Sequence, residues 1–421
     1  MTTCGGLVVA TVDGKPKGVA TRLPLLRSDL DLMPSPIEDR PGLLMRDSFR
    51  FSDATLVIPP PLVPVLELFD GQSTELDLRE ALTRITGELT VSGLAHHLIT
   101  TLDEAAFLDN ATYAQRKLDK YREFAAQEVR EAVHAGGAYP SEPVALQATF
   151  ERYFAGTPSL KAGEVVALAA PHVSPEGGWE SYRDAYAALP PSLGSRTFIV
   201  LGTSHYGAPE KFGLTRKPYR TPLGATTPDL ALIDALHRDA PDSILSEDYC
   251  HAVEHSIEFQ VLFLQRCFGP DIRVAPILCG PFARSIYGQD RRPEDDDGVA
   301  RFFEALRSAA PADAVWVLGV DMAHMGRRYG DRLDAKADRD EMAAVAERDR
   351  RRIASINAFD ADGYWEQVRD RKDDLKWCGS SPFYTYLKTA PRARGELLRY
   401  QQWNIDENSV VSFAGMRFLK G

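Results

Sequence analysis

Four short, continuous apolar runs alternate with helical patterns in the C-terminal two-thirds of the chain, at residues 165–170, 197–201, 274–278 and 314–320. A run without polar residues predicts a strand that is covered on both faces, because a half-exposed strand would alternate apolar and polar residues. Strands that alternate with helices predict parallel pairing through crossover connections. We therefore expect an α/β fold, a layered domain whose central sheet is largely parallel or mixed and is flanked by helices.

A histidine follows three of these four runs within four residues: His172, His205 and His324. In an open α/β sheet, ligands bind at the carboxyl ends of the strands, so residues that follow neighbouring strands meet at one edge. A lone histidine is more often structural, but three in equivalent positions favour a site, because sites gather titratable groups in one cleft. A carboxylate from Asp321 or Glu254 would hold one of the imidazoles in a fixed tautomer.

The segment Trp377-Cys378-Gly379-Ser380-Ser381-Pro382 adds a cysteine to the candidate site. Ser381 suits the N-cap of a helix and Pro382 its first position. Cys378 is therefore expected just before a helix N-terminus, where the helix dipole favours a thiolate. Imidazoles together with a thiolate suit iron, copper or zinc rather than magnesium or calcium.

Residues 254–265 have the pattern of an amphipathic helix, with Glu254, His255 and Glu258 near its N-terminal end. A helix in this position could present the three side chains to the cleft. His251 and His255 also have the spacing of two ligands on one helix. The sequence between them is HAVEH rather than H-E-x-x-H, so the glutamate is misplaced for a zinc protease.

Residues 36–110 have the pattern of a small winged-helix-like domain. An extended stretch at 55–58 precedes a proline cluster, and three helical patterns follow, at 62–69, from Ser73 onwards and at 91–102. Winged helices often bind DNA, but this segment carries thirteen acidic and five basic residues. A DNA reader needs the opposite balance, so we favour a peptide-binding or packing role.

A long, charged helical pattern at 105–133 connects this module to the α/β domain. We expect two domains: residues 1–125, the winged-helix-like module with its helical connector, and residues 130–421, the α/β domain.

The charge balance excludes two classes of partner. The chain has 49 Lys and Arg against 60 Asp and Glu, a net charge of −11, which argues against general binding to nucleic acid or to an anionic membrane. Two highly charged stretches, 290–297 and 327–352, are interpreted as a solvated loop and a largely exposed helix.

The expected compartment is the cytoplasm. The first residues lack a basic region before a short apolar run, so they do not resemble a signal peptide, and no apolar stretch reaches the roughly 18–20 residues of a membrane span. The odd number of scattered cysteines is no disulfide framework and suggests a reducing compartment. They are Cys4, Cys250, Cys267, Cys279 and Cys378.

Seven short motifs resemble, in order, those of the Memo family, also known as protein B of the AmmeMemoRadiSam system. In chain order, the seven motifs are His134-Ala-Gly-Gly-Ala-Tyr-Pro140, Pro171-His172, Leu201-Gly-Thr-Ser-His205, Thr221-Pro-Leu-Gly224, Glu254-His-Ser-Ile-Glu258, Val320-Asp-Met-Ala-His324 and Cys378-Gly379.

This family is similar in structure to class III extradiol dioxygenases of the LigB type. The resemblance implies that His172, His205 and Cys378 bind a metal ion, with His255 as the counterpart of a catalytic base. Cys378 stands where those dioxygenases have a glutamate, so the resemblance does not imply a ring-cleaving activity for this chain. We take His255, Asp321 and His324 as the candidate catalytic residues.

The N-terminal module resembles, more weakly, a PqqD-like domain, through Arg46-Asp47, Leu68-Phe-Asp-Gly71 and residues 102–108. Such domains bind peptides and present them to radical SAM enzymes. The resemblance therefore implies radical SAM and AMMECR-type proteins as partners, beside a small-molecule or peptide ligand.

Three functions remain open at this stage. The first is a non-heme, metal-dependent oxidoreductase in which the metal is iron or copper, with zinc as a further option. The second is a non-catalytic scaffold that holds a peptide or a metal ion. The third is a hydrolase or transferase with Cys378 as the nucleophile and His255 or His324 as the base.

Overall fold

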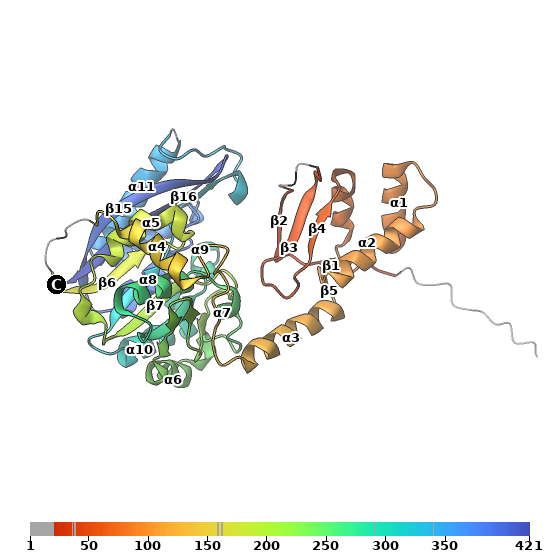
Figure 1. The fold of residues 1–421 in the computed structure, drawn as a ribbon. Helices are drawn as coiled ribbons and strands as arrows, with labels where there is room; N and C mark the ends of the chain where they lie inside the picture. Colours follow the sequence, from red (N-terminus) through yellow and green to blue (C-terminus); the bar gives the residue numbers. More distant parts are fainter. Residues whose placement is uncertain are drawn as a thin grey trace, which may run out of the picture. The chain divides into compact units, whose positions relative to one another are not determined.

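The computed structural model describes residues 21–35, 37, 39–157, 160, 163–289, 291–339 and 341–421. Its chain divides into two compact units, Met1–Lys120 and Tyr121–Gly421, which are described separately (Figure 1). The described residues do not include Cys4 or the N-terminal segment in which we looked for a signal peptide. They also do not include Asp290 of the charged loop. Within those residues, no helix is long and apolar enough to cross a membrane.

The N-terminal unit is built from a small antiparallel sheet and short helices. Strand β3 lies between β2 and β4, and β1 pairs with β5. The elements are β1 (Leu25–Leu26), β2 (Leu30–Pro34), β3 (Leu43–Asp47), β4 (Thr55–Ile58), the 3-10 helix η1 (Pro60–Leu68), α1 (Glu75–Thr86), α2 (Ser92–Glu104) and β5 (Leu108–Asp109).

Local sequence signals set the ends of α1. Thr74, rather than Ser73, is the N-cap: its hydroxyl accepts from the backbone N–H of Asp77, whose carboxylate accepts from the N–H of Thr74. Gly87 ends the helix with a φ of 73°, a left-handed conformation that glycine adopts without strain. Between the helices and the sheet, Met45, Leu78 and Leu82 are fully buried.

Arg27 is a buried cation in this unit. Its guanidinium donates to the carboxylates of Asp47 and Asp29 and to the carbonyl oxygen of Ala106. Both Arg27 and Asp47 are buried, and the pair links the chain before β2 to the end of β3.

The second unit contains a mixed sheet in the order β11-β12-β7-β13-β6-β16-β14, with β8 beside β12 and β15 beside β16. The strands from β11 to β6 are parallel, and β16 is antiparallel to β6. The strands are β6 (Val165–Ala170), β7 (Thr197–Thr203), β8 (Phe212–Leu214), β11 (Thr227–Pro228), β12 (Arg273–Cys279), β13 (Val315–Gly319), β14 (His324–Gly326), β15 (Ala393–Asp406) and β16 (Ser409–Lys420).

This architecture confirms the expected layered α/β fold, and the four apolar runs form β6, β7, β12 and β13. The four strands are almost wholly buried, as continuous apolar runs predict. The long hairpin of β15 and β16 was not anticipated from the sequence. It completes the sheet beside β6 (Figure 1).

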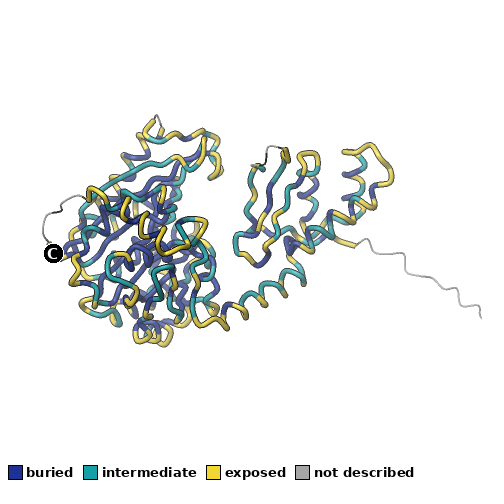
Figure 2. Tube along the Cα trace, viewed as in Figure 1, coloured by how far each residue is buried: buried dark blue, intermediate teal, exposed yellow. Residues whose placement is uncertain are grey.

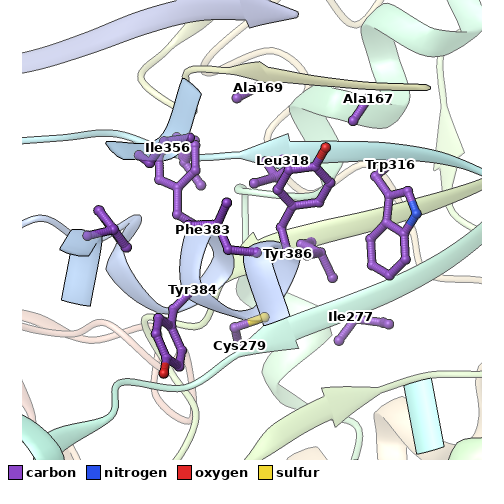
Figure 3. Close-up of a cluster of buried hydrophobic side chains, with 14 of the residues drawn as sticks. Ala167, Ala169, Ile277, Cys279, Trp316, Leu318, Ile356, Phe383, Tyr384 and Tyr386 are labelled. Carbon is purple, nitrogen blue, oxygen red and sulfur yellow. The ribbon is translucent and has the colours of Figure 1, made fainter. Parts of the chain in front are cut away.

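Helices cover both faces of the sheet, and each face has its own core (Figures 1 and 2). The helices that pack on one face are α4 (Pro143–Phe154), α5 (Pro175–Tyr186) and α8 (Glu258–Phe268). The helices that pack on the other face are α6 (Leu230–Asp239), α10 (Asp297–Ala309), α11 (Glu341–Asn357), α12 (Ala361–Arg369) and α13 (Ser380–Thr389). Figure 3 shows the second core, where Phe383 and Tyr386 of α13 meet Leu318 and Trp316 of β13.

Three helices differ from the sequence-based expectation. The connector helix α3 covers Ala111–Ala126 rather than the whole of 105–133, and α11 begins only at Glu341 within the charged stretch 327–352. Helix α13 begins at Ser380 with Gly379 as its N-cap, so neither Ser381 nor Pro382 has the expected capping position. Cys378 still directly precedes the first turn.

Candidate metal centre

The three histidines that follow the strands lie at one edge of the sheet. His172 follows β6, His205 follows β7, and His324 begins β14 after the loop that leaves β13. Because β6, β13 and β7 are parallel neighbours, their carboxyl ends meet at the same edge.

Cys378 joins this edge from the other end of the chain. Its Sγ lies 3.2 Å from Nε2 of His172, and one ligand atom each from His172, His205 and Cys378 lie within 4.8 Å of one another. Thr203, at the end of β7, donates its hydroxyl to the carbonyl oxygen of Cys378 over 3.0 Å. Gly379 passes so close to Asp321 that a Cβ would lie 2.7 Å from the Asp321 carbonyl oxygen.

The hydrogen bonds of the three strand-end histidines fix the same tautomer. Nδ1 of His172 donates to the Gly319 carbonyl oxygen over 2.9 Å, and Nδ1 of His324 to the Met322 carbonyl oxygen over 2.9 Å. Nδ1 of His205 donates to the carboxylate of Glu254 over 3.0 Å. The neutral form of each imidazole therefore has its proton on Nδ1 and its lone pair on Nε2, and a metal ion would take the place of the Nε2 proton of a charged imidazole.

Glu254 is the carboxylate that orients His205. It is fully buried, and it accepts from the backbone N–H groups of His205, His255 and Ser256 as well as from the imidazole of His205. Burial alone would raise the pKa of Glu254, but His205, His255 and these N–H donors hold that pKa well below its usual value. Glu254 in turn outweighs the effect of burial on His205 and raises the pKa of His205 well above its usual value.

Glu254 and His255 lie in a non-helical turn, not on the helix expected at 254–265. The turn joins the short helix α7 (Cys250–Val253) to α8, which begins only at Glu258. It crosses the strand ends closely: a Cβ at Gly319 would lie 2.1 Å from the Ser256 carbonyl oxygen. Glycine at the end of β13 is thus what lets this turn approach the site.

His255 stacks on His205, with ring centroids 5.0 Å apart and an interplanar angle of 9°. Its ring centroid is also 5.1 Å from that of His172. Burial, aided by the neighbouring histidines and opposed by Glu254, lowers the pKa of His255 well below its usual value. The imidazole is therefore neutral near pH 7.

Asp321 lies beneath His172. Its carboxylate accepts from the backbone N–H of His172 over 2.8 Å, and its other oxygen lies 3.4 Å from Nε2 of the same residue. Burial raises the pKa of Asp321 to about 6, although His324 and the backbone donors oppose the rise. Burial has the opposite effect on a histidine, because it disfavours the charged imidazolium, and it lowers the pKa of His324.

The Cys378 thiol is acidic for a buried cysteine. Burial would raise its pKa, but the electrostatic effect of the His172 imidazole and the hydrogen bonds with His172 and His205 lower the pKa of Cys378 to about 7. By contrast, burial raises the pKa of both Cys267 and Cys279 to about 12. Cys378 thus has the electropositive surroundings that a metal-binding or reactive thiol needs.

A cavity of about 770 Å³ opens above these residues. All six candidate residues line it, and so does His134, whose ring lies edge-to-face with His255 at 5.7 Å. Other parts of the unit contribute aromatic and basic side chains that no sequence pattern predicts at this site. They are Arg328, Tyr329, Lys376 and Trp403.

His251 is not part of the site, so the HAVEH pattern is no ligand pair. Its Nδ1 is hydrogen-bonded to the Tyr219 hydroxyl over 2.7 Å, and burial lowers the pKa of His251 to about 4. Glu258, which was expected to face the cleft, is instead paired with the buried guanidinium of Arg130. Arg130 also donates to the His251 carbonyl oxygen over 2.8 Å, which fixes α7.

Asp349 on α11 is a positioning residue that the sequence did not reveal. Its fully buried carboxylate accepts from the Trp377 indole over 2.7 Å, the Tyr400 hydroxyl over 2.7 Å and the Ser412 hydroxyl over 2.6 Å. Ser412 also accepts from the backbone N–H of Ala323 over 2.8 Å. One carboxylate therefore links the residue before Cys378 to the loop that carries Asp321 and His324.

Comparison with known proteins decides the family. The family model for Memo-like protein matches residues 130–417, which include every residue of the site. The chain belongs to the Memo-like protein family.

Three relatives, each a MEMO1 family protein, show how far the similarity extends. A MEMO1 family protein of Aquifex aeolicus is 25% identical over 380 residues, which cover 89% of this chain and 95% of that protein. One from Methanosarcina mazei is 27% identical over 295 residues, covering 69% of this chain and 98% of that protein. One from Thermus thermophilus is 29% identical over 265 residues, covering 62% of this chain and 74% of that protein.

The extents of these matches differ in an informative way. The Aquifex match is longer than the Memo-like region, so it extends into the N-terminal unit. The Methanosarcina match covers nearly all of its protein with a region about the size of the Memo-like domain. The Aquifex protein therefore resembles this chain beyond the Memo-like region, whereas the Methanosarcina match has about the length of that region alone.

Proposed function

We propose that this protein binds one metal ion through Nε2 of His172, Nε2 of His205 and Sγ of Cys378. The observation that carries the proposal is the convergence of these atoms within 4.8 Å from three distant parts of the chain. The donor set fits an ion, because both imidazoles donate through Nδ1 and the thiol has a pKa of about 7. Glu254 is excluded as a ligand, because its oxygens already accept from four N–H groups.

The ligand set favours iron or copper, with zinc as a further option. Imidazole and thiolate are borderline-to-soft donors, which these metals prefer over the carboxylate and water oxygens that magnesium and calcium select. The pKa of Cys378 means that the metal competes with a weakly held proton at neutral pH.

We further propose a dioxygenase-like oxidoreductase activity, in which a bound iron or copper ion supplies electron transfer with O₂ or an oxygen-bearing substrate. The chain itself would bind a small molecule or a peptide in the cavity of about 770 Å³. His255 would accept a proton from that ligand, because its imidazole lines the cavity beside His172 and His205. Asp321 would hold His172, and His324 would offer a second neutral imidazole.

A second candidate function is non-catalytic: a scaffold that holds a metal ion or a peptide for radical SAM and AMMECR-type partner proteins. The thiolate of Cys378 favours it, because the related dioxygenases have a carboxylate at that position. The N-terminal unit would then present the peptide.

Metal analysis of protein purified without a histidine tag tests the metal proposal. We expect about one iron, copper or zinc ion per chain, and its loss from His172→Ala. His237→Ala is the control, because His237 is an exposed histidine on α6. A chain that retains no metal after reconstitution, or a His172→Ala variant that retains it fully, would contradict the proposal.

Turnover separates the two candidate functions. Steady O₂ consumption that requires the reconstituted metal and is lost in His255→Gln would support the oxidoreductase. Metal retention without O₂ consumption over a panel of phenolic and thiol substrates would favour the scaffold.

A further inference from the structure

A second, smaller cavity reaches the candidate ligands from a different side of the unit. It has a volume of about 250 Å³ and lies between the ends of β7 and β12, the short helix α9 (Ala283–Tyr287) and the start of α13. His205, Lys376 and Cys378 line both this cavity and the larger one. The candidate ligands thus stand at the boundary between two spaces of different size.

The walls of the small cavity are mainly apolar. Side chains from α9, α12, the end of β12 and the segments before α9 and α13 form them: Cys279, Phe282, Ala283, Ile286, Trp365 and Trp377.

Most polar groups on these walls are already paired with the protein; an exception is the hydroxyl of Ser204, which is buried without a hydrogen-bond partner. The Thr203 hydroxyl donates to the Cys378 carbonyl oxygen, and the Ser381 hydroxyl to that of Cys279. The indole N–H of Trp377 donates to Asp349, and the carboxylate of Asp373 accepts from Arg352 over 2.7 Å. A polar ligand would find few partners here, whereas a small apolar molecule needs none.

The volume selects the size of the occupant. Pockets for drug-sized ligands begin at about 300 Å³, whereas a dry apolar cavity of about 150 Å³ already holds benzene or xenon. The small cavity of about 250 Å³ therefore has room for diatomic molecules or for one small apolar molecule, and it is too small for a drug-sized ligand.

We propose that the small cavity admits an uncharged diatomic gas, of the class of O₂ and nitric oxide, to the metal centre. The larger cavity is then left to the organic ligand. This inference rests on the proposed metal site, and it assigns the two reactants of an oxidase or oxygenase to separate approaches.

Two matched substitutions test it. Ile286 lines only the small cavity and Ile405 only the larger one, and both are half-buried. Ile286→Phe and Ile405→Phe therefore add the same volume to different spaces. Ala283→Leu on the same wall serves as a second filling variant if Ile286→Phe does not fold.

The first measurement needs no metal. Crystals of the metal-free protein under xenon pressure should show xenon beside Phe282 and Trp365, and the Ile286→Phe crystals should not. Absence of xenon from the small cavity of the unsubstituted protein would overturn the inference.

The second measurement follows nitric oxide binding to the protein loaded with ferrous iron, by stopped-flow absorbance and electron paramagnetic resonance. We expect Ile286→Phe to slow association by about an order of magnitude, a change of about 1.4 kcal/mol in the barrier, while Ile405→Phe leaves the rate unchanged. Equal rates in the unsubstituted protein and Ile286→Phe would overturn the inference. A protein that takes up no iron gives no nitrosyl signal, which contradicts the metal proposal and leaves xenon to decide on the cavity.

Discussion

Nε2 of His172 and Sγ of Cys378 lie 3.2 Å apart, although the two residues are 206 positions apart in the chain. The contact forms only when the end of β6 and the segment before α13 have docked against the same sheet edge. Properties of the Cys378 thiol therefore report on the assembly of the whole site.

Cys378 should react with iodoacetamide at neutral pH in the metal-free protein. His172 and His205 outweigh burial and lower its thiol pKa to about 7. Because the thiolate is the reacting form, the alkylation rate should rise as pH rises through about 7 and level off above pH 8. Mass spectrometry of the Cys378 peptide between pH 5.5 and 9 measures the profile.

The control is the remaining cysteines. Burial raises the pKa of Cys250, Cys267 and Cys279, so they should stay unlabelled at pH 7.5. A Cys4→Ser background removes the cysteine that lies outside the described residues. Both unfolding and the change His172→Ala should move the midpoint of Cys378 above pH 8. A midpoint above pH 8 in the folded, unsubstituted protein, or a midpoint that stays near 7 in His172→Ala, would contradict this account.

Glu254→Gln should weaken metal binding by about 10–100-fold, the usual cost of losing a carboxylate that orients a ligating histidine. The amide would disturb the acceptor of the His205 imidazole and of three backbone N–H groups. Competition titrations with a metal chelator measure the affinity. Glu366→Gln, at an exposed position on α12, should leave it unchanged, and an equal loss in both variants would rule out a specific role.

Asp349→Asn should lower the free energy of unfolding by about 1–3 kcal/mol, because an amide cannot accept from all three buried donors. It should also weaken metal binding, since Trp377 and Ser412 would no longer be held. Urea unfolding and the thiolate-to-metal absorption band of a cobalt-loaded sample measure the two effects.

The matched control is Glu347→Gln on the same helix. Its exposed ion pair with Arg351 should contribute no more than about 1 kcal/mol. If Asp349→Asn lowers stability but leaves the cobalt spectrum and affinity unchanged, its role is structural only.

Arg130→Met alone should destabilise the protein by about 3–5 kcal/mol, because it leaves the carboxylate of Glu258 buried without its cation. The double variant Arg130→Met/Glu258→Met should lose less free energy of unfolding than the two single variants lose together. A double-mutant cycle by urea unfolding measures the coupling, and additive effects would show that the pair does not act as a unit.

The sheet and its histidines could be predicted because both follow from local patterns. Continuous apolar runs specify buried strands, and the carboxyl ends of parallel strands converge whatever the details of packing. His172, His205 and His324 therefore lie where strand order alone would put them. Cys378 was found because a short motif before a helix marks it.

The missed residues have no local signature. Asp349 belongs to a charged stretch that was expected to be exposed, and only the pairing of β15 with β16 brings Tyr400 and Ser412 around its carboxylate. The apolar pattern of the residues that follow Glu254 and His255 predicts a helix there, whereas the structure has a turn. That turn depends on a backbone crossing at Gly319, far away in sequence.

The place of β16 has a consequence for the order of events in the cell. Ser412 on this strand fixes the loop that carries Asp321 and His324, and Val411 lines the larger cavity. Synthesis proceeds from the N-terminus at about 5–20 residues per second, so all three candidate ligands leave the ribosome before the strand that completes their surroundings. If the chain binds a metal ion as proposed, the pocket for that ion is completed late in synthesis, and a nascent or truncated chain would carry the candidate ligands without the pocket that holds them in place.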